Sequence, residues 1–423
     1  MKKILVLGGA NLHCKLVKAA KEMGLYTIVT DYLADSPAKQ LADERWMLNV
    51  KDVDSIVQKC REVQVDAVIS THLDPCQRPY QMICERLGLP CYIDNFEQVY
   101  ALTDKDAFKA LCVKHGVDII PTYTKEELND PAAASGVQFP VLVKPVHSRG
   151  SRGQTICYTL EQLSSAIKKA EEESENGKAI IEKYMGNKND FTMTYIFVDG
   201  IPHMTKTSDR HLGPLELGFE KVGIGTVSPS RFSDMYITNV QDRLLGMLKA
   251  LGVKNGPVFM QGFVDGNTVR FYDPGFRFPG SEYDTIFESI HHIDLMKMMV
   301  GFALTGRMDT AYGSLSSDLY QLNGKRVITL FPVIRSGTIS KVQGIEEIAA
   351  MPEVVCYTIR HTVGETVPLS RDVNQRFGEF DIVGKDIHDL GRLIDTVLNK
   401  LRVLDEHGEN MLVGNISSQD IVG

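Results

Sequence analysis

A lysine ends a short apolar run in this chain, just before a proline and a glycine-containing loop. Residues 139–145 read Phe-Pro-Val-Leu-Val-Lys-Pro, and residues 147–153 read His-Ser-Arg-Gly-Ser-Arg-Gly. Burying the Lys144 ammonium is unfavourable unless an anion meets it. Gly150 and Gly153 let backbone N–H groups turn toward a ligand, as anion-binding loops require. The pattern predicts a polyphosphate site, with a plain β-hairpin and a polar turn as the alternative.

A second pattern supplies oxygen ligands. Residues 260–264 and 268–273 are strand-like runs joined through Asp265-Gly266, a strong hairpin signal. Such a hairpin can bring the Gln261 oxygen and the Asp273 carboxylate together. Oxygen ligands beside phosphates are what Mg²⁺ prefers. A solvent-facing polar pair is the alternative.

Two further cations are candidates for anion binding. Lys105 opens a predicted helix with Thr103 or Asp104 as its N-cap, and an ordinary solvated helix lysine is its alternative. Arg210 lies in a polar segment, residues 208–213, which we interpret as a loop. There it could clamp a carboxylate with two hydrogen bonds or belong to a surface turn.

An apolar strand also runs directly into mixed residues and a glycine. Residues 179–186 read Ala-Ile-Ile-Glu-Lys-Tyr-Met-Gly. This composition suits a hinge whose backbone N–H and C=O groups face a ligand ring.

The first turn of the chain invites a dinucleotide-binding interpretation. Gly8-Gly9 follows an apolar strand, and Asp31 lies about where a ribose-binding acid would. The full G-x-G-x-x-G is missing, so the match is weak. We interpret this region as scaffold, or as one wall of a substrate site at the carboxyl ends of the strands.

Cysteines and histidines do not form a metal-binding pattern. The 8 cysteines are scattered without a C-x-x-C pair, which is typical of buried or free thiols in a reducing compartment. His291 and His292 lie in a predicted amphipathic helix over 289–304, and we interpret them as structural.

The elements that position these residues begin with an alternation of strands and helices. Alternation of this kind predicts a parallel, doubly wound sheet. The expected strands are residues 3–9, 26–31 and 66–70, with another short strand after Gly88-Leu89-Pro90.

Hairpins and mixed elements follow. Asp199-Gly200 predicts a hairpin between residues 191–198 and the run from Ile201, and the glycine-rich stretch 218–225 reads as a loop near the substrate. An amphipathic helix is expected over 160–173. Later strands are expected at 326–333, 336–342, 354–362 and 377–384, with helices at 345–350 and 387–401.

Composition narrows the function classes. The 423 residues are 43% hydrophobic and 24% charged, as in globular proteins, and the net charge of −8 argues against a general nucleic-acid binder. No apolar run approaches the roughly 20 residues of a membrane span, and the N-terminal apolar segment is too short for a signal peptide. We therefore expect a cytoplasmic protein without nucleic-acid or membrane partners.

The order of these pieces resembles the ATP-grasp superfamily, and within it the carboxylate–amine ligase and carbamoyl-phosphate-synthetase-like branch. The resemblance rests on an ordered set of motifs: Lys105, Val143-Lys144-Pro145 with its glycine loop, Glu182-Lys183-Tyr184-Met185, and Asp273-x-Gly275-x-Arg277. It implies an α/β and α+β fold in three parts. These are an N-terminal doubly wound parallel-sheet lobe (1–95), an ATP-grasp core (96–310) with a mobile lid (about 115–185), and a small C-terminal α+β lobe (311–423).

The resemblance also implies residue roles, which we carry over to matching positions. Lys105 and Lys144 would hold the α- and β-phosphates. Asp190, or neighbouring Asn189, would take the ribose hydroxyls, and Arg277 would stabilise the moving γ-phosphoryl group. The lid loop would contribute His147, Ser148, Arg149, Gly150 and Gly153, and the adenine hinge Glu182, Lys183, Tyr184 and Met185. The metal ligands would be Asp273 and Gln261.

Two departures concern the metal. The usual first metal glutamate is replaced by Gln261, and Gly275 stands where the usual E-x-N-x-R has its asparagine. The site could bind metal more weakly, bind one ion rather than two, or use another side chain.

The implied activity is that of an ATP-dependent carbon–nitrogen ligase. It would activate a small-molecule carboxylate as an acylphosphate and join it to an amine, with Mg²⁺ or Mn²⁺ as metal. A biotin-carboxylase-like or carbamoyl-phosphate-like enzyme acting on bicarbonate is one alternative, and a non-catalytic nucleotide-binding regulatory protein is another. The C-terminal lobe of this branch can carry a dimer contact, so a homodimer is one expectation.

Overall fold

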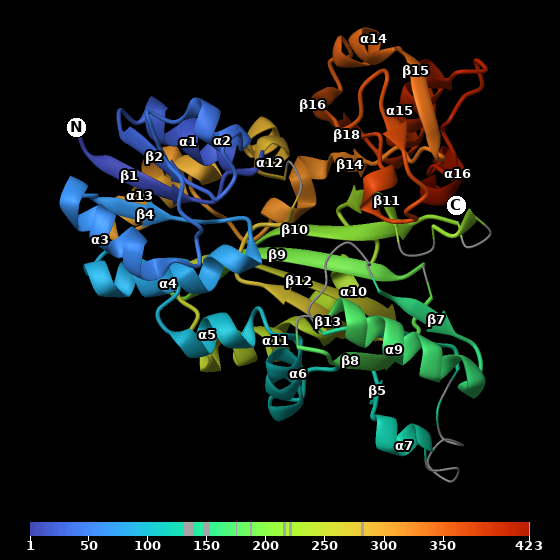
Figure 1. Cartoon of the computed structure of the whole chain (residues 1–423), viewed down its shortest axis with the longest axis horizontal. Helices are drawn as coiled ribbons and strands as arrows, with labels where there is room; N and C mark the ends of the chain where they lie inside the picture. Colours follow the sequence, from blue (N-terminus) through green and yellow to red (C-terminus); the bar gives the residue numbers. More distant parts are fainter. Residues whose placement is uncertain are drawn as a thin grey trace.

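Three layers of the molecule surround the candidate site (Figure 1). The computed structural model describes residues 1–422 except 130–136, 138, 147–152, 175, 187, 215–216, 220–221 and 281–282. In this view the N-terminal lobe (blue) lies at the left, the C-terminal lobe (red) lies at the upper right as a continuation of a large sheet, and a smaller sheet lies at the lower right. Among the described residues, no helix is long and apolar enough to cross a membrane.

The N-terminal lobe is a four-stranded parallel sheet in the order β3-β2-β1-β4, as predicted. The strands are β1 (Lys3–Leu7), β2 (Tyr26–Thr30), β3 (Glu44–Trp46) and β4 (Ala67–Ile69), and the helices are α1 (His13–Glu22), α2 (Pro37–Leu41), α3 (Val53–Val63) and α4 (Asp74–Leu87). Leu5 pairs with Ile28 on one side and Val68 on the other. All three are fully buried, as expected for a sheet covered on both faces.

The prediction of a short strand after Pro90 is wrong. Residues 89–95, all of them described, contain no strand. Tyr92 instead turns inward, packs on Tyr80 and Phe276, and donates its hydroxyl to the Ser70 carbonyl at 2.8 Å. Asn95 then caps the short helix α5 (Phe96–Ala101).

The smaller sheet, in the order β5-β8-β6-β7, carries Lys144 and the hinge. Its strands are β5 (Thr122–Tyr123), β6 (Val141–Pro145), β7 (Thr155–Cys157) and β8 (Ala179–Lys183). Helices α6 (Lys105–Lys114), α7 (Lys125–Asn129) and α9 (Leu163–Glu173) accompany it, with a 3₁₀ turn at Leu160–Gln162. Val141, Val143 and Ile181 form its core with Leu163 and Ala166 of α9.

The large sheet has eight strands in the order β13-β12-β9-β10-β11-β14-β18-β16. They are β9 (Asp190–Val198), β10 (Ile201–Leu212), β11 (Gly223–Ser228), β12 (Gly256–Asp265), β13 (Thr268–Gly275), β14 (Arg326–Leu330), β16 (Val354–Ile359) and β18 (Gly378–Gly384). Both predicted hairpins, β9–β10 and β12–β13, are confirmed.

Two loop predictions in this sheet are wrong. Arg210 lies inside the twelve-residue strand β10, where it pairs directly with Asp190. The predicted glycine-rich loop ends in β11, since Gly223 and Gly225 pair with neighbouring strands. A Cβ at Gly223 would lie 2.7 Å from an Arg376 guanidinium nitrogen, so glycine serves close packing there.

Helices cover this sheet and link it to the N-terminal lobe. They are α10 (Ser233–Asn239), α11 (Gln241–Ala250), α12 (Tyr283–His291) and α13 (Leu295–Thr305). The prediction of a single helix over 289–304 is wrong. Two helices are present instead, because His292 adopts φ of 57° and separates α12 from α13. Asp294 then caps α13 by accepting a hydrogen bond from the Lys297 N–H.

The C-terminal lobe continues the large sheet. Its own small sheet has the order β17-β15-β19, from β15 (Gly337–Gln343), β17 (Thr366–Val367) and β19 (Arg402–Asp405). Its helices are α14 (Ile345–Ala349), α15 (Ile387–Lys400) and α16 (Ser418–Val422), with 3₁₀ turns at Thr310–Tyr312, Leu319–Gly324 and Val373–Gln375. Because β14, β16 and β18 belong to the eight-stranded sheet, the backbone pairing crosses the predicted boundary at residue 310. The predicted domain boundaries stay predictions. All 8 cysteines are free thiols, as predicted.

Candidate active site

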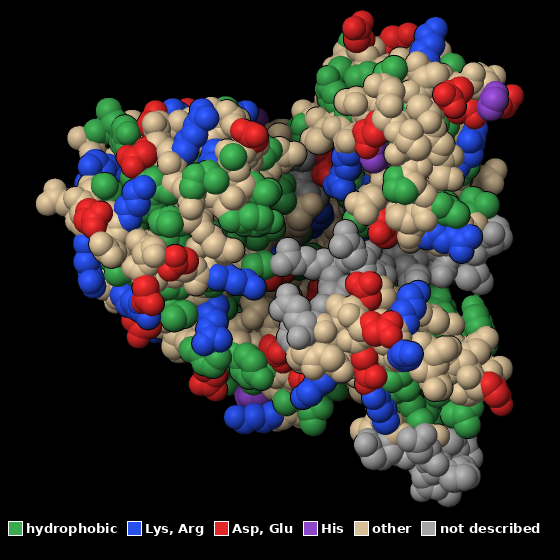
Figure 2. All heavy atoms as spheres, in the orientation of Figure 1, with side chains coloured by type: hydrophobic (Ala, Val, Ile, Leu, Met, Phe, Trp, Pro, Cys, Tyr) green, Lys and Arg blue, Asp and Glu red, His purple; other side chains and the backbone are tan. Residues whose placement is uncertain are grey.

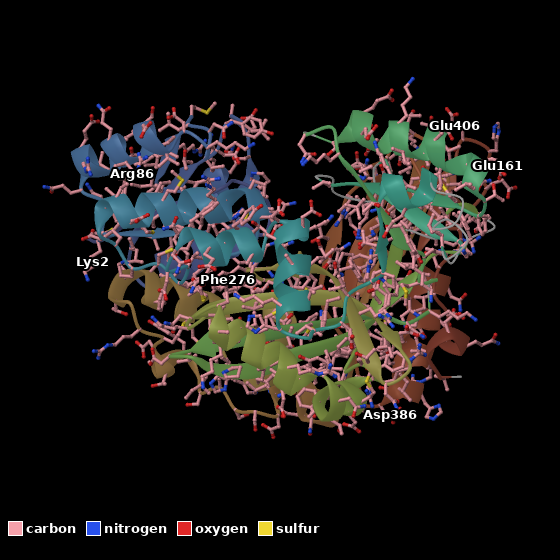
Figure 3. The ribbon with its side chains drawn as sticks, turned by 90° about the horizontal axis from the view of Figure 1, so that it is seen from below. Lys2, Arg86, Glu161, Phe276, Asp386 and Glu406 are labelled. Carbon is pink, nitrogen blue, oxygen red and sulfur yellow. The ribbon has the colours of Figure 1, made fainter. Side chains whose placement is uncertain are left out.

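The predicted site residues converge where the two sheets meet the N-terminal lobe. Figure 2 shows the surface hollowed between the N-terminal lobe and the C-terminal lobe, with lysine or arginine side chains in the hollow. Phe276, labelled in Figure 3, lies beside the N-terminal lobe at the end of β13. Its ring is 5.3 Å from that of Tyr92, so the end of β13 is anchored to that lobe.

Glu182 joins two buried lysines. Its carboxylate lies 2.5 Å from the Lys144 ammonium and accepts a further hydrogen bond from Lys109. Glu182 is 1% exposed. Burial raises the pKa of Glu182, but Lys144 and Lys109 together outweigh burial and lower it. Glu182 is therefore ionised, and it fixes both ammonium groups at the base of the smaller sheet.

Lys105 approaches the metal pair predicted on the large sheet. Asp104 caps α6 by accepting hydrogen bonds from the N–H groups of Asp106 and Ala107, which places Lys105 on the first turn. Its ammonium lies 3.9 Å from an Asp273 carboxylate oxygen. A cation on helix α6 and a carboxylate on strand β13 thus lie close together.

Gln261 and Asp273 are directly opposed across the β12–β13 hairpin. Opposed residues of an antiparallel pair share a face of the sheet, which is what the sequence predicted for this pair. A register shift follows immediately, between Gln261 and Gly262. Among the described residues, no group of three or more His, Cys, Asp or Glu side chains could hold a metal ion. Of the two side chains predicted to bind the metal, Asp273 carries a carboxylate and Gln261 is neutral.

Asp190 is held by an arginine and a tyrosine. Arg210 donates to it at 2.8 Å and the Tyr272 hydroxyl at 3.0 Å. Burial raises the pKa of Asp190, while Arg210 and Tyr272 lower it in part. The Lys144 ammonium is 5.8 Å from the centre of the Tyr272 ring. Tyr272 thus links the Asp190 pair to the lysine pair.

Arg277 contacts the N-terminal lobe. It donates to both carboxylate oxygens of Asp74, at 2.6 Å and 2.8 Å, and to the Phe278 carbonyl at 2.9 Å. Its guanidinium carbon is 5.8 Å from the centre of the Phe259 ring. Asp74 is the first residue of α4, so the N-terminal lobe forms one wall of the site.

The hinge and the glycine loop are described only in part. The Lys183 N–H donates to the Pro121 carbonyl and the Tyr184 N–H to the Pro140 carbonyl, both at 2.9 Å. The adenine contacts of Lys183 and Met185 stay a prediction. The predicted lid residues His147, Ser148, Arg149 and Gly150 lie outside the described residues. Gly153 has φ of 68°, and a Cβ there would lie 2.7 Å from Pro145, so glycine is required.

Sequence reasoning missed several residues of this site: Lys109, Asp74, Tyr272 and Arg376. Lys109 had a signal, because it is four residues after Lys105 and such residues share a helix face. Arg376 had none. It lies between the 3₁₀ turn Val373–Gln375 and β18, with its guanidinium carbon 4.1 Å from the centre of the Phe331 ring, and it donates to the Gly223 carbonyl at 2.9 Å. Burial first, and then Arg210 and Arg360, lower the pKa of Arg376. The C-terminal lobe therefore adds positive charge beside Arg210.

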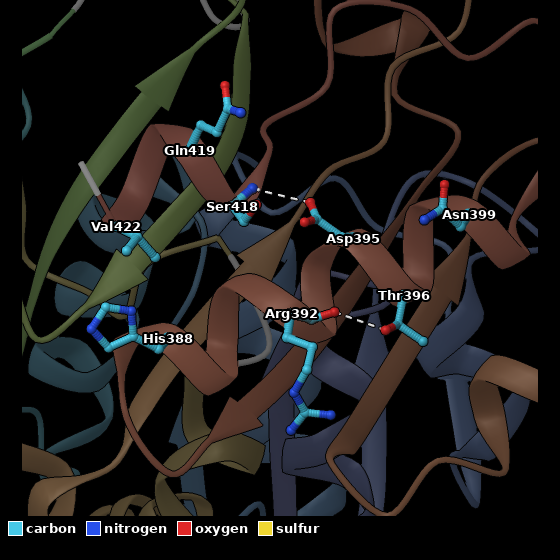
Figure 4. A pocket seen from close by; sticks show the side chains of 8 residues that line it. All are labelled: His388, Arg392, Asp395, Thr396, Asn399, Ser418, Gln419 and Val422. Carbon is cyan, nitrogen blue, oxygen red and sulfur yellow. Dashed lines mark hydrogen bonds between the residues drawn. The ribbon is translucent and has the colours of Figure 1, made fainter.

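A separate groove lies on the outer side of the C-terminal lobe (Figure 4). Its volume is about 640 Å³, and α15 and α16 line it. Ser418 donates to Asp395 at 3.1 Å across it. None of the predicted site residues lines this groove.

Three family models match successive parts of the chain. Residues 1–76 match the ribonucleotide synthetase preATP-grasp domain. Residues 104–196 match the ATP-binding domain of the carbamoyl-phosphate synthase L chain. Residues 330–404 match the L-amino acid ligase C-terminal domain 2.

Solved structures extend the likeness to nearly the whole chain. The L-amino acid ligase from Bacillus licheniformis superposes with a TM-score of 0.77 at 17% identity, over 96% of this chain and 99% of that one. The chain has the ATP-grasp fold. The biotin carboxylase domain of the Hydrogenobacter thermophilus 2-oxoglutarate carboxylase superposes with a TM-score of 0.71 at 18% identity, over 95% and 90% of the two chains. That structure is a dimer holding MgADP, ADP and bicarbonate.

Curated relatives of this chain match over shorter stretches. A formate-dependent phosphoribosylglycinamide formyltransferase from Prochlorococcus marinus is 27% identical over 199 residues, 45% of this chain and 50% of the relative. The chain spans about half the length of the curated relatives it matches first. These matches confirm the predicted fold and the resemblance to the carboxylate–amine ligase and carbamoyl-phosphate-synthetase-like branch.

Proposed function

We propose that this ATP-grasp protein is an ATP-dependent carbon–nitrogen ligase that activates a carboxylate as an acylphosphate and joins it to an amine. The observation that carries the proposal is the approach of Lys105, on helix α6, to Asp273, on strand β13 of the large sheet, with 3.9 Å between the ammonium nitrogen and a carboxylate oxygen. The proposed phosphate-binding cation therefore lies beside the proposed metal ligand. Arg277 follows Asp273 by four residues. Phosphoryl transfer needs this grouping, because catalysis there depends on positioning and charge neutralisation.

ATP would lie between the two sheets. Lys105 and Lys144 would meet the α- and β-phosphates, and the hinge at Lys183 to Met185 would meet adenine. Lys144 already has a buried carboxylate partner in Glu182, which supports a fixed rather than a swinging ammonium. Asp190 would accept from the ribose hydroxyls, with Arg210 and Tyr272 holding it in place. The MgADP of the structurally similar biotin carboxylase domain supports the same ligands here.

Gln261 and Asp273 fit a magnesium ion. Their oxygens are opposed across one hairpin, and Mg²⁺ commonly takes only one or two protein ligands and completes its shell with phosphates and water. When bound, Mg²⁺ (or Mn²⁺) supplies charge neutralisation on the phosphates. Since Gln261 is neutral, Asp273 is the only one of the two that offsets the metal charge.

The proposed reaction has two steps. An oxygen of the acid substrate attacks the γ-phosphorus, the bond from that phosphorus to the β,γ-bridging oxygen breaks, and ADP leaves. Arg277, held by Asp74, would stabilise the negative charge on the group in transfer. The amine nitrogen then forms a bond to the acyl carbon, the carbon–oxygen bond to phosphate breaks, and the nitrogen loses a proton.

Release of ADP and phosphate from MgATP, measured across amino acids, dicarboxylates and bicarbonate with and without amines, tests the proposal. Release that depends on both an acid and an amine, and that is lost in Arg277→Ala, supports the ligase. Release with bicarbonate alone favours the bicarbonate-activating alternative. Tight ATP binding without turnover on any acceptor favours a regulatory nucleotide-binding protein. A homodimer stays a prediction, which sedimentation velocity checks.

A further inference from the structure

Lys206 is a buried lysine that the ligase reaction does not use. It lies on β10, is 9% exposed, and packs with its ammonium 5.6 Å from the centre of the Tyr283 ring on α12. Of the described residues, none offers its ammonium a hydrogen-bond acceptor or a carboxylate within 4.0 Å. A buried ammonium without a hydrogen-bonded partner is unfavourable, and an anion bound beside it would offset that cost.

The strand register places Lys206 on the face of the sheet that carries the metal pair. Three rows of opposed residues cross β12, β9 and β10 on this face. Phe263, Asp190 and Arg210 form the first, Gln261, Thr192 and Ser208 the second, and Phe259, Thr194 and Lys206 the third. Neighbouring rows are about 7 Å apart, since they are two residues apart along each strand.

The order of the three rows places Lys206 beyond the proposed metal ligand, on the side away from the proposed ribose ligand, where the acid substrate would bind. The first row holds the ribose ligand and the second the metal ligand. The third begins beneath Arg277, whose guanidinium lies over Phe259. Lys206 is two strands away from Phe259, at roughly 4.8 Å per strand, so its backbone is about 10 Å from the Phe259 backbone, over whose ring Arg277 lies.

The surroundings of Lys206 also favour an anion that comes from outside the protein. Burial lowers the pKa of Lys206, and the carboxylates of Asp381 and Glu379 raise it only in part. Thr329 donates to one oxygen of Asp381 at 2.6 Å, and the Cys356 thiol lies 3.1 Å from the other. Glu379 lies 3.9 Å from Arg360. Both acids therefore have partners of their own on the C-terminal strands.

We infer that Lys206 selects an acid substrate that carries a second anionic group, a carboxylate or a phosphate, several bonds from the carboxylate that is activated. This inference rests on the proposed ligase function and specifies its substrate class. Arg277 would act at the reacting end of that acid and Lys206 would act at the far end.

The test compares succinate, glutarate and adipate with butyrate, valerate and hexanoate, and adds 3-phosphoglycerate to distinguish a phosphate from a second carboxylate. Rates of acid-dependent ADP release give kcat/KM for each acid in the wild type, Lys206→Met and Lys206→Arg. A charge-assisted hydrogen bond corresponds to about 10- to 100-fold in affinity, so Lys206→Met should reduce the preference for the dianionic acid by about that factor. Lys206→Arg, which keeps the charge, should retain most of it.

Lys39→Met is the matched control. Lys39 is also fully buried, but in the N-terminal lobe, where it donates to the Asp31 and Leu33 carbonyls. Its variant should keep the wild-type preference. Thermal unfolding of each variant shows whether a loss reflects misfolding.

Failure of this inference and failure of the ligase proposal give different results. Wild-type turnover with equal kcat/KM for monoacids and diacids, or an unchanged preference in Lys206→Met, overturns the role of Lys206 and leaves the ligase. Absence of ADP release with every acid overturns the ligase. In that case calorimetric titration of glutarate and 3-phosphoglycerate into the MgADP complex decides the site: binding lost in Lys206→Met supports it, and no binding to the wild type overturns it.

Discussion

Arg277 and Asp74 form a two-point ion pair between the large sheet and the N-terminal lobe, with N–O distances of 2.6 Å and 2.8 Å. Arg277 is mostly buried, and Asp74 begins α4. Burial lowers the pKa of Arg277, but Asp74 outweighs it and raises the pKa overall. The arginine proposed to stabilise the phosphoryl group is thus positioned by a residue 203 positions earlier in the chain.

Asp74→Asn should lower kcat/KM for the acid substrate about 10- to 100-fold and leave ATP affinity nearly unchanged. The amide cannot match both guanidinium donors, so Arg277 loses its fixed orientation. Steady-state ADP release and ATP titration measure the two effects. Asp54→Asn is the control, because Asp54 also pairs with an arginine in this lobe but is 88% exposed. Equal losses in both variants would contradict a positioning role for Asp74.

Glu182→Gln should destabilise the protein by about 3 kcal/mol, because it leaves two buried ammonium groups facing a neutral amide. Urea unfolding measures the change. Glu171→Gln removes a carboxylate that pairs with Lys125 at the surface, and it should cost less than about 1 kcal/mol. A Glu182 variant as stable as the Glu171 variant would mean that the buried pair carries little net stability.

Lys144→Ala should weaken ATP binding by about 10- to 100-fold, the range for a charge-assisted hydrogen bond to phosphate. Calorimetric titration of ATP in the presence of Mg²⁺ provides the measurement. Lys125→Ala, in the same part of the chain but at the surface, is the control. Unchanged affinity in Lys144→Ala would remove the central assignment of the nucleotide site.

Gln261→Glu should reduce the Mg²⁺ concentration required for half-maximal ADP release by about tenfold, since a second carboxylate would then oppose Asp273. Asp273→Asn should raise that Mg²⁺ concentration, because it removes a carboxylate. Titration of ADP release with Mg²⁺ at saturating ATP measures the half-maximal Mg²⁺ concentration of each variant. A Gln261→Glu variant with unchanged magnesium dependence would show that the metal lies away from this hairpin position.

Asp381 should make stability depend on pH. Burial, reinforced by Glu379, raises the pKa of Asp381 from 3.8 to about 7. The protonated form therefore favours folding, and its contribution is complete below about pH 4 and lost as pH rises to about 7. The stability of the wild type relative to Asp381→Asn should fall across this window. Urea unfolding at pH 5 and pH 8 measures it, and a constant difference would mean that Asp381 stays ionised.

Local sequence signals predicted several of the spatial relationships in the candidate site. Asp265-Gly266 predicted the hairpin, and the hairpin alone brought Gln261 opposite Asp273. Thr103 or Asp104 predicted the start of α6, and Asp104 is the residue that caps it, next to Lys105. These relationships involve neighbours in sequence, for which turn and capping preferences are strong.

The missed residues depend on contacts between distant segments. Asp74 meets Arg277, and Arg376 reaches Gly223, only after separate lobes have packed. Arg210 was expected in a loop because its polar neighbours hide the strand pattern. In the folded chain, pairing with Asp190 extends β10 through it. Short-range preferences do not report on such pairings, since tertiary context decides them.

The eight-stranded sheet has a consequence for protein engineering and for evolution. Because β14 pairs with β11, truncation before residue 326 would strip one side of β11 of its hydrogen-bond partners. The exposed strand would be a template for aggregation, so the C-terminal lobe is not a module that can be cut away or exchanged at a linker. New specificity in this chain would more readily arise by substitution on β10, β14 and β18 than by swapping the lobe.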